Sequence, residues 1–296
     1  MQRFDVHAHF VVGPGAPVTG WSPGEAIAFM DAHGIAMQLL SAPVPADAEQ
    51  ARAVNERGAQ IVAAQPGRFG LLASLPMASP GPALEEVRYA ADVLGADGFV
   101  LMTNYDGAYF GDGRFEPVFA ELDRRRASVF VHPASPAGFG QLGLGRPGPL
   151  IEFPMDTART VVDAVFAGLF LRHPGLRVVL AHAGGVLPAL SQRILSLGVK
   201  PWVANPRQLT PEQLRAQLAS LYFDTAIAGT PVTLGPAIDV AGRAHFVFGS
   251  DFPPAGLDVI EATIDSLQTS LTAQDRNQME ATFTELFPAA AARADN

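Results

Sequence analysis

Eight short apolar runs alternate with longer segments of helical periodicity, and this alternation constrains the fold more than any other feature of the sequence. Pro and Gly mark the joins between them, as in Ser22-Pro23-Gly24. We expect strands at 4–9, 37–42, 70–75, 98–103, 128–133, 177–182, 221–225 and 245–250. We expect helices near 22–33, 46–65, 80–94, 114–127, 155–172, 185–197, 211–220, 231–241, 256–270 and 274–287.

Repeated strand-then-helix units in one apolar chain predict an α/β fold, a (β/α)8 TIM barrel. The alternative is an open doubly wound sheet, but no GxGxxG turn follows the first predicted strand. Composition does not change sharply along the 296 residues, and no Ser/Gly linker divides them. We therefore expect a single domain over residues 1–296.

The composition excludes several kinds of chemistry and partner. The chain has no cysteine, which excludes thiolate catalysis and Cys-ligated metal; with no signal-peptide pattern in the sequence, a cytoplasmic protein is expected. A formal net charge of -9 argues against nucleic acid as a partner. No run approaches the ~20 apolar residues of a membrane span. The arginine run 124–126 ends a predicted helix, where cations meet the negative end of the helix dipole.

Four of the seven histidines stand where predicted strands end, which is where the loops of a barrel converge and reactive side chains are expected. These four are His7 and His9 on the first strand, His132 on the fifth and His182 on the sixth. The other three lie at helix ends or at the start of a strand, and we expect them to be structural: His33, His173 and His245.

Three of the strand-end histidines and one aspartate form a candidate metal site. His7 and His9 are two residues apart on a strand, so their imidazoles leave the same face and can converge on one divalent ion. His132 adds a third imidazole, and Asp251 at the end of strand eight is placed to add a carboxylate beside strand one. Taken alone, Asp251 could instead be a capping residue in a Pro-rich turn. Three imidazoles and one carboxylate suit zinc first, then manganese or iron.

His182 is followed by Ala183-Gly184-Gly185, which allows the backbone to turn sharply into the next helix. The residues alone leave three roles open: a fourth metal ligand, a general acid or base beside the metal, or a core histidine bonded to a carbonyl. Asp5 and Asp224 are expected to form hydrogen bonds inside the barrel or to orient the ligand histidines.

The sequence resembles the amidohydrolase superfamily nearly end to end. Within it, the similarity is to the branch of aminocarboxymuconate-semialdehyde decarboxylase and the metal-dependent aromatic acid decarboxylases. The resemblance rests on residues 5–9, 129–133, 181–188 with 193–194, 222–225 and 248–253. It implies one metal ion, usually zinc and in some members manganese, held by His7, His9, His132 and Asp251. It also implies that His182 is a nearby acid or base and not a ligand.

The resemblance further implies that Arg193 reaches the neighbouring subunit's site and pairs with a substrate carboxylate, which requires at least a homodimer. A planar guanidinium suits this contact, although Arg193 could equally form a surface ion pair. The sequence departs from the semialdehyde decarboxylases in the loop at 10–21, which contains no arginine. The long loop at 134–154 predicts a lid over an apolar substrate, and Arg146 within it is a weaker candidate for carboxylate binding.

We therefore expect a metal-dependent decarboxylase without an organic cofactor, acting on a small aromatic or related unsaturated carboxylic acid. His182 or Asp251 would deliver the proton to the carbon that loses CO2. The alternatives are a metal-dependent hydrolase of a lactone, ester or amide, and a barrel that binds a ligand without turnover.

The single lysine of the chain, Lys200, limits the number of metal ions. Two-metal members of the superfamily bridge their ions with a carbamylated lysine at the end of strand four. Here that strand ends Leu101-Met102-Thr103-Asn104, and Lys200 lies far along the chain. The sequence therefore predicts one metal ion.

Overall fold

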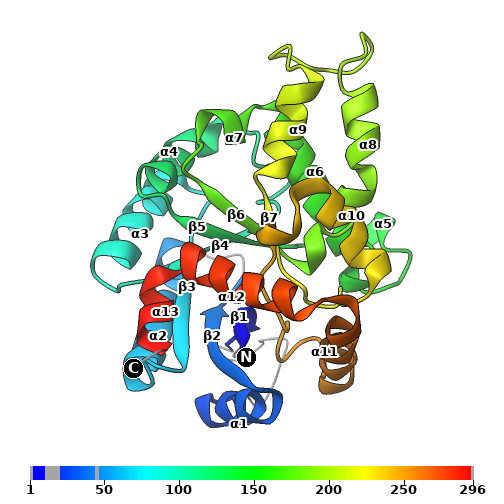
Figure 1. Cartoon of the computed structure of the whole chain (residues 1–296). Coiled ribbons are helices and arrows are strands. Elements are labelled where there is room, and N and C mark those ends of the chain that lie inside the picture. Colours follow the sequence, from blue (N-terminus) through cyan, green and yellow to red (C-terminus); the bar gives the residue numbers. More distant parts are fainter. Residues whose placement is uncertain (1–2, 11–20, 44–46, 295–296) are drawn as a thin grey trace.

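The centre of the computed structural model, which describes residues 3–10, 21–43 and 47–294, is a curled sheet of seven parallel strands. The strands lie in sequence order from β1 to β7, and helices surround them (Figure 1). The strands are β1 (Arg3–His9), β2 (Ile35–Ser41), β3 (Phe69–Ser74), β4 (Gly98–Met102), β5 (Ser128–His132), β6 (Arg177–Leu180) and β7 (Tyr222–Phe223). The predicted α/β alternation is therefore confirmed for seven strands.

The helices follow the predicted order closely because their ends carry the expected signals. Ser22 is the N-cap of the first helix: its side chain accepts a hydrogen bond from the backbone N of Glu25, and Pro23 is the first residue of that helix. Asp47 and Gln50 form a capping box at the next helix. The helices are α1 (Pro23–His33), α2 (Ala48–Ala64), α3 (Pro80–Asp92), α4 (Glu116–Arg124), α5 (Phe139–Leu142), α6 (Glu152–Phe166), α7 (Leu169–Arg172), α8 (Leu187–Leu197), α9 (Pro211–Ala219), α10 (Pro231–Ala241), α11 (Leu257–Ser270), α12 (Ala273–Leu286) and α13 (Pro288–Ala294).

Three features of the helices differ from the sequence prediction. The predicted helix at 155–172 is divided into α6 and α7, because Gly168 between them has a φ of 68° and breaks the helical path. The short α5 lies inside the predicted loop at 134–154, and α13 extends the chain beyond the last predicted helix.

The eighth predicted strand, 245–250, is not a continuous strand. Residues Arg243–His245 form a 3-10 turn, and the following segment lies between β7 and β1 through isolated parallel bridges. The bridged pairs are Phe246 with Phe223, Phe248 with Asp5, and Phe252 with Ala8. Two backbone N–H groups of this segment donate to side chains and not to carbonyls of a neighbouring strand. The backbone N of Gly249 donates to Thr225 Oγ1, and that of Ser250 donates to Asp5 Oδ1.

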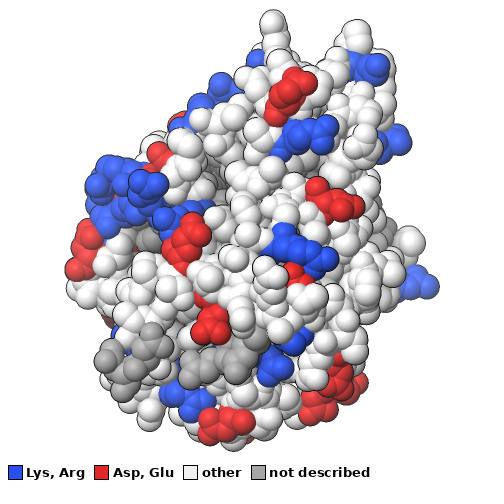
Figure 2. Space-filling model, in the orientation of Figure 1, with Lys and Arg blue, Asp and Glu red and all other residues white. Residues whose placement is uncertain are grey.

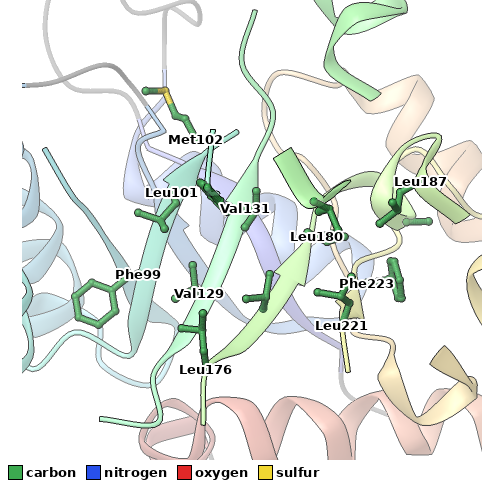
Figure 3. Packing of buried hydrophobic residues seen from close by; sticks show 14 of the residues in the cluster. Phe99, Leu101, Met102, Val129, Val131, Leu176, Leu180, Leu187, Leu221 and Phe223 are labelled. Carbon is green, nitrogen blue, oxygen red and sulfur yellow. The ribbon is translucent and has the colours of Figure 1, made fainter. Parts of the chain in front are cut away.

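Alternate residues of the strands fill two apolar layers. The outer layer lies between strands and helices, as Figure 3 shows for Phe99, Leu101, Val129, Val131 and Leu180. The intervening strand residues point the other way and form an inner cluster, which includes Leu72, Val100, Phe130 and Val179. Side chains from α12, α13 and the residue between them complete this cluster, among them Phe283 and Phe287.

The inner cluster closes one end of the sheet. Ser128, the first residue of β5, donates from Oγ to the carbonyl of Leu286 in α12 at 2.6 Å. A Cβ on Gly98, the first residue of β4, would lie 3.1 Å from the ring of Phe287. Side chains therefore fill the N-terminal ends of the strands, and the carboxyl ends are left for the site.

Charged side chains on the face in Figure 2 occur mainly as mixed groups. Arginine side chains gather over the α3–α4 side beside Asp and Glu. Part of the arginine run 124–126 is ion-paired there: Arg125 contacts both Asp92 and Glu121 at 2.7 Å. No helix among the described residues is long and apolar enough to cross a membrane.

Candidate metal centre and active-site pocket

The four predicted ligands lie together at the carboxyl end of the sheet. His7, His9, His132 and Asp251 each present one ligand atom, and all four atoms lie within 4.8 Å of one another. Asp251 Oδ1 is 3.2 Å from the Nε2 atoms of both His7 and His9. The ring centroids of His9 and His132 are 4.8 Å apart.

The unpaired atoms of this cluster fit a divalent metal ion. His7 Nε2 and His9 Nε2 are buried and have no well-formed hydrogen bond among the described residues, although both are near Asp251. Buried polar atoms of this kind are costly unless a partner satisfies them. Three imidazoles and a carboxylate are the donor set that zinc and its neighbours use.

Two neighbouring side chains fix the histidine rings. His7 Nδ1 lies 2.6 Å from Asp224 Oδ2, and His9 Nδ1 lies 3.0 Å from Ser41 Oγ. Such partners direct the opposite ring nitrogen toward a metal. Asp224 was expected in this role. Sequence reasoning missed Ser41, although it ends β2 and so carried the same strand-end signal.

The charges of the cluster suit a cation. Burial alone would raise the pKa of Asp251, but the adjacent histidines hold it well below its usual value. Burial lowers the pKa values of His9 and His132, so both favour the neutral form that binds metal. Burial also acts to lower the pKa of His7, yet Asp251 and Asp224 together raise it to about 10. The two carboxylates thus stabilise a positive charge beside His7, and a metal ion bound there would supply that charge in place of the proton.

Close backbone packing joins the segment that bears Asp251 to β1. The backbone N of Asp251 donates to the carbonyl of His7 at 2.7 Å. A Cβ at Gly249 would lie 2.8 Å from Asp224 Oδ2 and 2.9 Å from His7 Cβ, so only glycine fits there. Asp5 lies deeper, where burial raises its pKa to about 6 and its carboxylate accepts hydrogen bonds from Ser250 and Gln38. Asp5 therefore forms hydrogen bonds inside the sheet, as expected.

His182 stands beside the cluster and is not one of the four grouped ligands. Its φ is 55°, a left-handed conformation that is uncommon for a residue other than glycine. Its backbone N donates to Asp224 Oδ1 at 2.7 Å, and its Nδ1 lies 3.2 Å from the carbonyl of Ala226. Its Nε2 is 4.0 Å from Asp251 Oδ2, so the imidazole faces the carboxylate across the pocket.

The other three histidines have structural partners, as expected. His33 Nδ1 and His245 Nδ1 lie 2.8 Å and 2.9 Å from the carbonyls of Phe29 and Leu221. His173 Nε2 lies 3.0 Å from Glu116 Oε1.

A large pocket opens above the cluster and is lined by His9, His132, His182 and Asp251. Its other walls are mainly apolar and include Phe10, Met102, Phe153, Ile227 and Val232. The Phe153 ring centroid lies 6.5 Å from that of His132. Parts of the loop at 134–154 line this pocket, and its role as a lid stays a prediction. Phe153 was not singled out from the sequence, where it is one of many aromatic residues.

The described residues that line the pocket include no lysine or arginine. Arg193, on α8, and Arg146 are exposed, and neither lines the pocket. Most of the loop at 10–21 lies outside the described residues, but residues 11–20 and 44–46 contain no basic side chain in the sequence. A lysine or arginine at this pocket would therefore have to come from a movement of the chain or from another copy.

Comparison with known proteins gives consistent matches over most of the chain. The sequence model of the family described as Amidohydrolase matches residues 4–282, a span that includes all four grouped ligands. A decarboxylase of Penicillium terrestre is 33% identical over an alignment of 326 positions, gaps included, which covers 97% of this chain and 95% of that protein. A 6-methylsalicylic acid decarboxylase of Aspergillus aculeatus is 36% identical over 284 residues, covering 87% of this chain and 86% of that protein.

The fold is also similar to solved structures. The crystal structure of 2,6-dihydroxybenzoate decarboxylase from Rhizobium superimposes with a TM-score of 0.81 at 25% identity. The match covers 97% of this chain and 98% of that one.

Proposed function

Since the chain belongs to the amidohydrolase family, we propose that it is a metal-dependent decarboxylase that releases CO2 from an aromatic carboxylic acid. The observation that carries this proposal is the convergence of three imidazoles and one carboxylate within 4.8 Å, at the base of a mainly apolar pocket. Relatives named for 6-methylsalicylic acid and 2,6-dihydroxybenzoate act on hydroxylated benzoic acids. We expect a substrate of that class.

His7, His9, His132 and Asp251 would hold one divalent ion, zinc or manganese. When bound, the ion supplies a Lewis acid that offsets negative charge on the substrate. Asp224 and Ser41 keep the rings of His7 and His9 in the orientation that this requires. No organic cofactor enters the proposal.

His182 and Asp251 are the candidates for proton delivery, because both line the pocket and their side chains face each other. In the proposed reaction the bond between the ring carbon and the carboxylate breaks, and its electron pair stays on the carbon. A proton from His182 or Asp251 then bonds to that carbon, leaving an arene and CO2. Phe153, Met102 and Phe10 provide apolar walls for an aromatic ring.

We also infer a homodimer in which Arg193 of one subunit meets the substrate carboxylate in the partner's pocket. The absence of lysine and arginine among the described lining residues supports a cation supplied in trans. A guanidinium binds a carboxylate with two parallel hydrogen bonds, which would orient the substrate.

We infer that residues 246–252 act as the eighth strand and complete the barrel, since they bridge both β7 and β1. On the same basis we treat residues 1–296 as one domain.

The test is to incubate the metal-loaded protein with a panel of hydroxybenzoic acids and to measure CO2, with esters and lactones assayed in parallel. The proposal predicts CO2 from at least one acid, and loss of that activity in His132→Ala, which removes a ligand. Hydrolysis of esters or lactones, with no CO2 from any acid, would show that the chain is a hydrolase instead.

A further inference from the structure

A buried carboxylate outside the metal cluster joins several loops at the carboxyl end of the sheet. Asp156, in the second turn of α6, is fully buried. It accepts hydrogen bonds from Thr103 Oγ1 at 2.5 Å, Asn104 Nδ2 at 2.7 Å and Tyr109 Oη at 2.7 Å. Arg159 Nη1 lies 3.5 Å from it. Burial and then Asp156 raise the pKa of Tyr109 to about 12, so the phenol keeps the proton that it donates.

Thr103 connects this carboxylate to the end of β5. Its backbone N donates to the carbonyl of His132 at 3.1 Å. Its Oγ1 accepts from the backbone N of Ala134 at 3.0 Å. Because its hydroxyl proton is directed to Asp156, a lone pair of the oxygen faces Ala134. Thr103 therefore holds the peptide groups on both sides of Pro133, directly after His132.

His132 depends on its backbone more than the other two histidines of the cluster. The rings of His7 and His9 are oriented by Asp224 and Ser41. The buried Nδ1 of His132 is unpaired, as are the Nε2 atoms of His7 and His9 that face the cluster, and no hydrogen bond from a described residue orients the ring through its other nitrogen. The direction of its imidazole is therefore set by packing and by the position of the β5 backbone.

We propose that Asp156 is a positioning residue for the metal site: through Thr103 it fixes the backbone beside His132 and holds that imidazole toward the other ligands. The same carboxylate binds Asn104, whose Nδ2 also donates to the carbonyl of Ser135 at 3.1 Å. Asp156 thus fixes two loops that enter the pocket wall. The inference depends on the metal site of the proposed function.

The experiment measures metal binding and not turnover. Zinc affinity is determined by competition with a chromophoric chelator, and the visible absorption spectrum of the cobalt-loaded protein reports the ligand geometry. Two variants break the connection from Asp156 through Thr103 to the backbone beside His132: Asp156→Asn removes the carboxylate and Thr103→Val removes the hydroxyl. Thr103→Ser keeps the hydroxyl. Glu86→Gln is the matched control, because Glu86 is 2% exposed and hydrogen-bonded to Asn55 and Arg52 away from the cluster.

We expect Asp156→Asn and Thr103→Val to weaken zinc binding about 10-fold or more, the lower end of the effect of losing an outer partner of a ligand. Both should also shift the cobalt spectrum, while Thr103→Ser and Glu86→Gln should bind and absorb as the wild type does. Wild-type affinity and spectrum in a folded Asp156→Asn or Thr103→Val would overturn the inference. An equal loss in Glu86→Gln would also overturn it, by assigning the effect to general destabilisation. A wild-type protein that binds no divalent ion would contradict the proposed function and this inference together.

Discussion

His7 Nδ1 lies 2.6 Å from Asp224 Oδ2, and both side chains are fully buried. The other oxygen of the same carboxylate accepts hydrogen bonds from the backbone N atoms of His182 and Ala226, at 2.7 Å and 3.1 Å. One aspartate on the loop after β7 therefore orients a metal ligand and holds the turn that bears the candidate acid or base.

Asp224→Asn should weaken both functions of this carboxylate. An amide has one acceptor oxygen, so it cannot accept from His7 and from the two backbone N–H groups without turning an NH2 toward a donor. We expect metal affinity to fall by about 10- to 100-fold, as for other outer partners of ligand histidines. Chelator competition measures the change, with Asp239→Asn on the exposed side of α10 as the control. Equal affinities in the two variants would contradict the role of Asp224.

Gly249→Ala tests the close packing beneath the site. The new Cβ would lie under 3.0 Å from Asp224 Oδ2 and from His7 Cβ, so this pair must move apart. We expect a loss of about 1–3 kcal/mol in the free energy of unfolding, typical of overpacking, and weaker metal binding. The matched control is Gly235→Ala in α10, where an added Cβ meets nothing within 4 Å. Urea unfolding should show Gly235→Ala as stable as the wild type or more so, by about 0.5–1 kcal/mol.

Glu121 should make stability depend on acidic pH. Hydrogen bonds from Arg124 and Arg125 lower its pKa from 4.5 to about 2. Because the folded-state pKa is depressed, the contribution to stability is present above the unfolded pKa and is lost as pH falls from about 4.5 toward 2. Urea unfolding should show the wild type more stable than Glu121→Gln at pH 7, with the difference shrinking below pH 4.5. Glu85→Gln, at an exposed position of α3, serves as the control; a difference for Glu121→Gln that does not change with pH would contradict this account.

Mixing two inactive variants tests the arginine supplied in trans. In a dimer that contains one Arg193→Ala chain and one His182→Asn chain, one pocket keeps His182 and receives Arg193 from its partner. Random mixing gives hetero-dimers as half of all dimers, so about a quarter of the pockets should be complete. CO2 release should therefore return to about a quarter of the wild-type rate. If Arg193 acts within its own chain, no pocket is complete and the mixture stays inactive.

The positions of the four grouped ligands could be predicted because strand geometry is regular. Residues two apart share a face, which brings His7 and His9 together, and the carboxyl ends of parallel strands meet, which adds His132 and Asp251. Asp156 could not be predicted in the same way. It lies on a helix 53 residues from Thr103, and that contact depends on how α6 packs against the end of β4.

The eighth strand shows another limit of sequence patterns. The run at 245–250 has the composition of a buried strand, and it does lie between β7 and β1. Its backbone N–H groups at Gly249 and Ser250 are taken by Thr225 and Asp5. The apolar pattern of 245–250 does not show this competition, because the competing polar side chains lie elsewhere in the chain, on β1 and just after β7.

Metal titration of the stripped protein tests whether His7, His9, His132 and Asp251 hold the single ion on which CO2 release depends. Zinc or manganese is added stepwise to metal-free protein, and the rate of CO2 release from a hydroxybenzoic acid is followed against the metal bound per chain. The four-ligand site predicts no activity without metal and a linear rise that ends at one ion per chain. Full activity in the stripped protein, or a rise that continues to two ions per chain, would contradict the account.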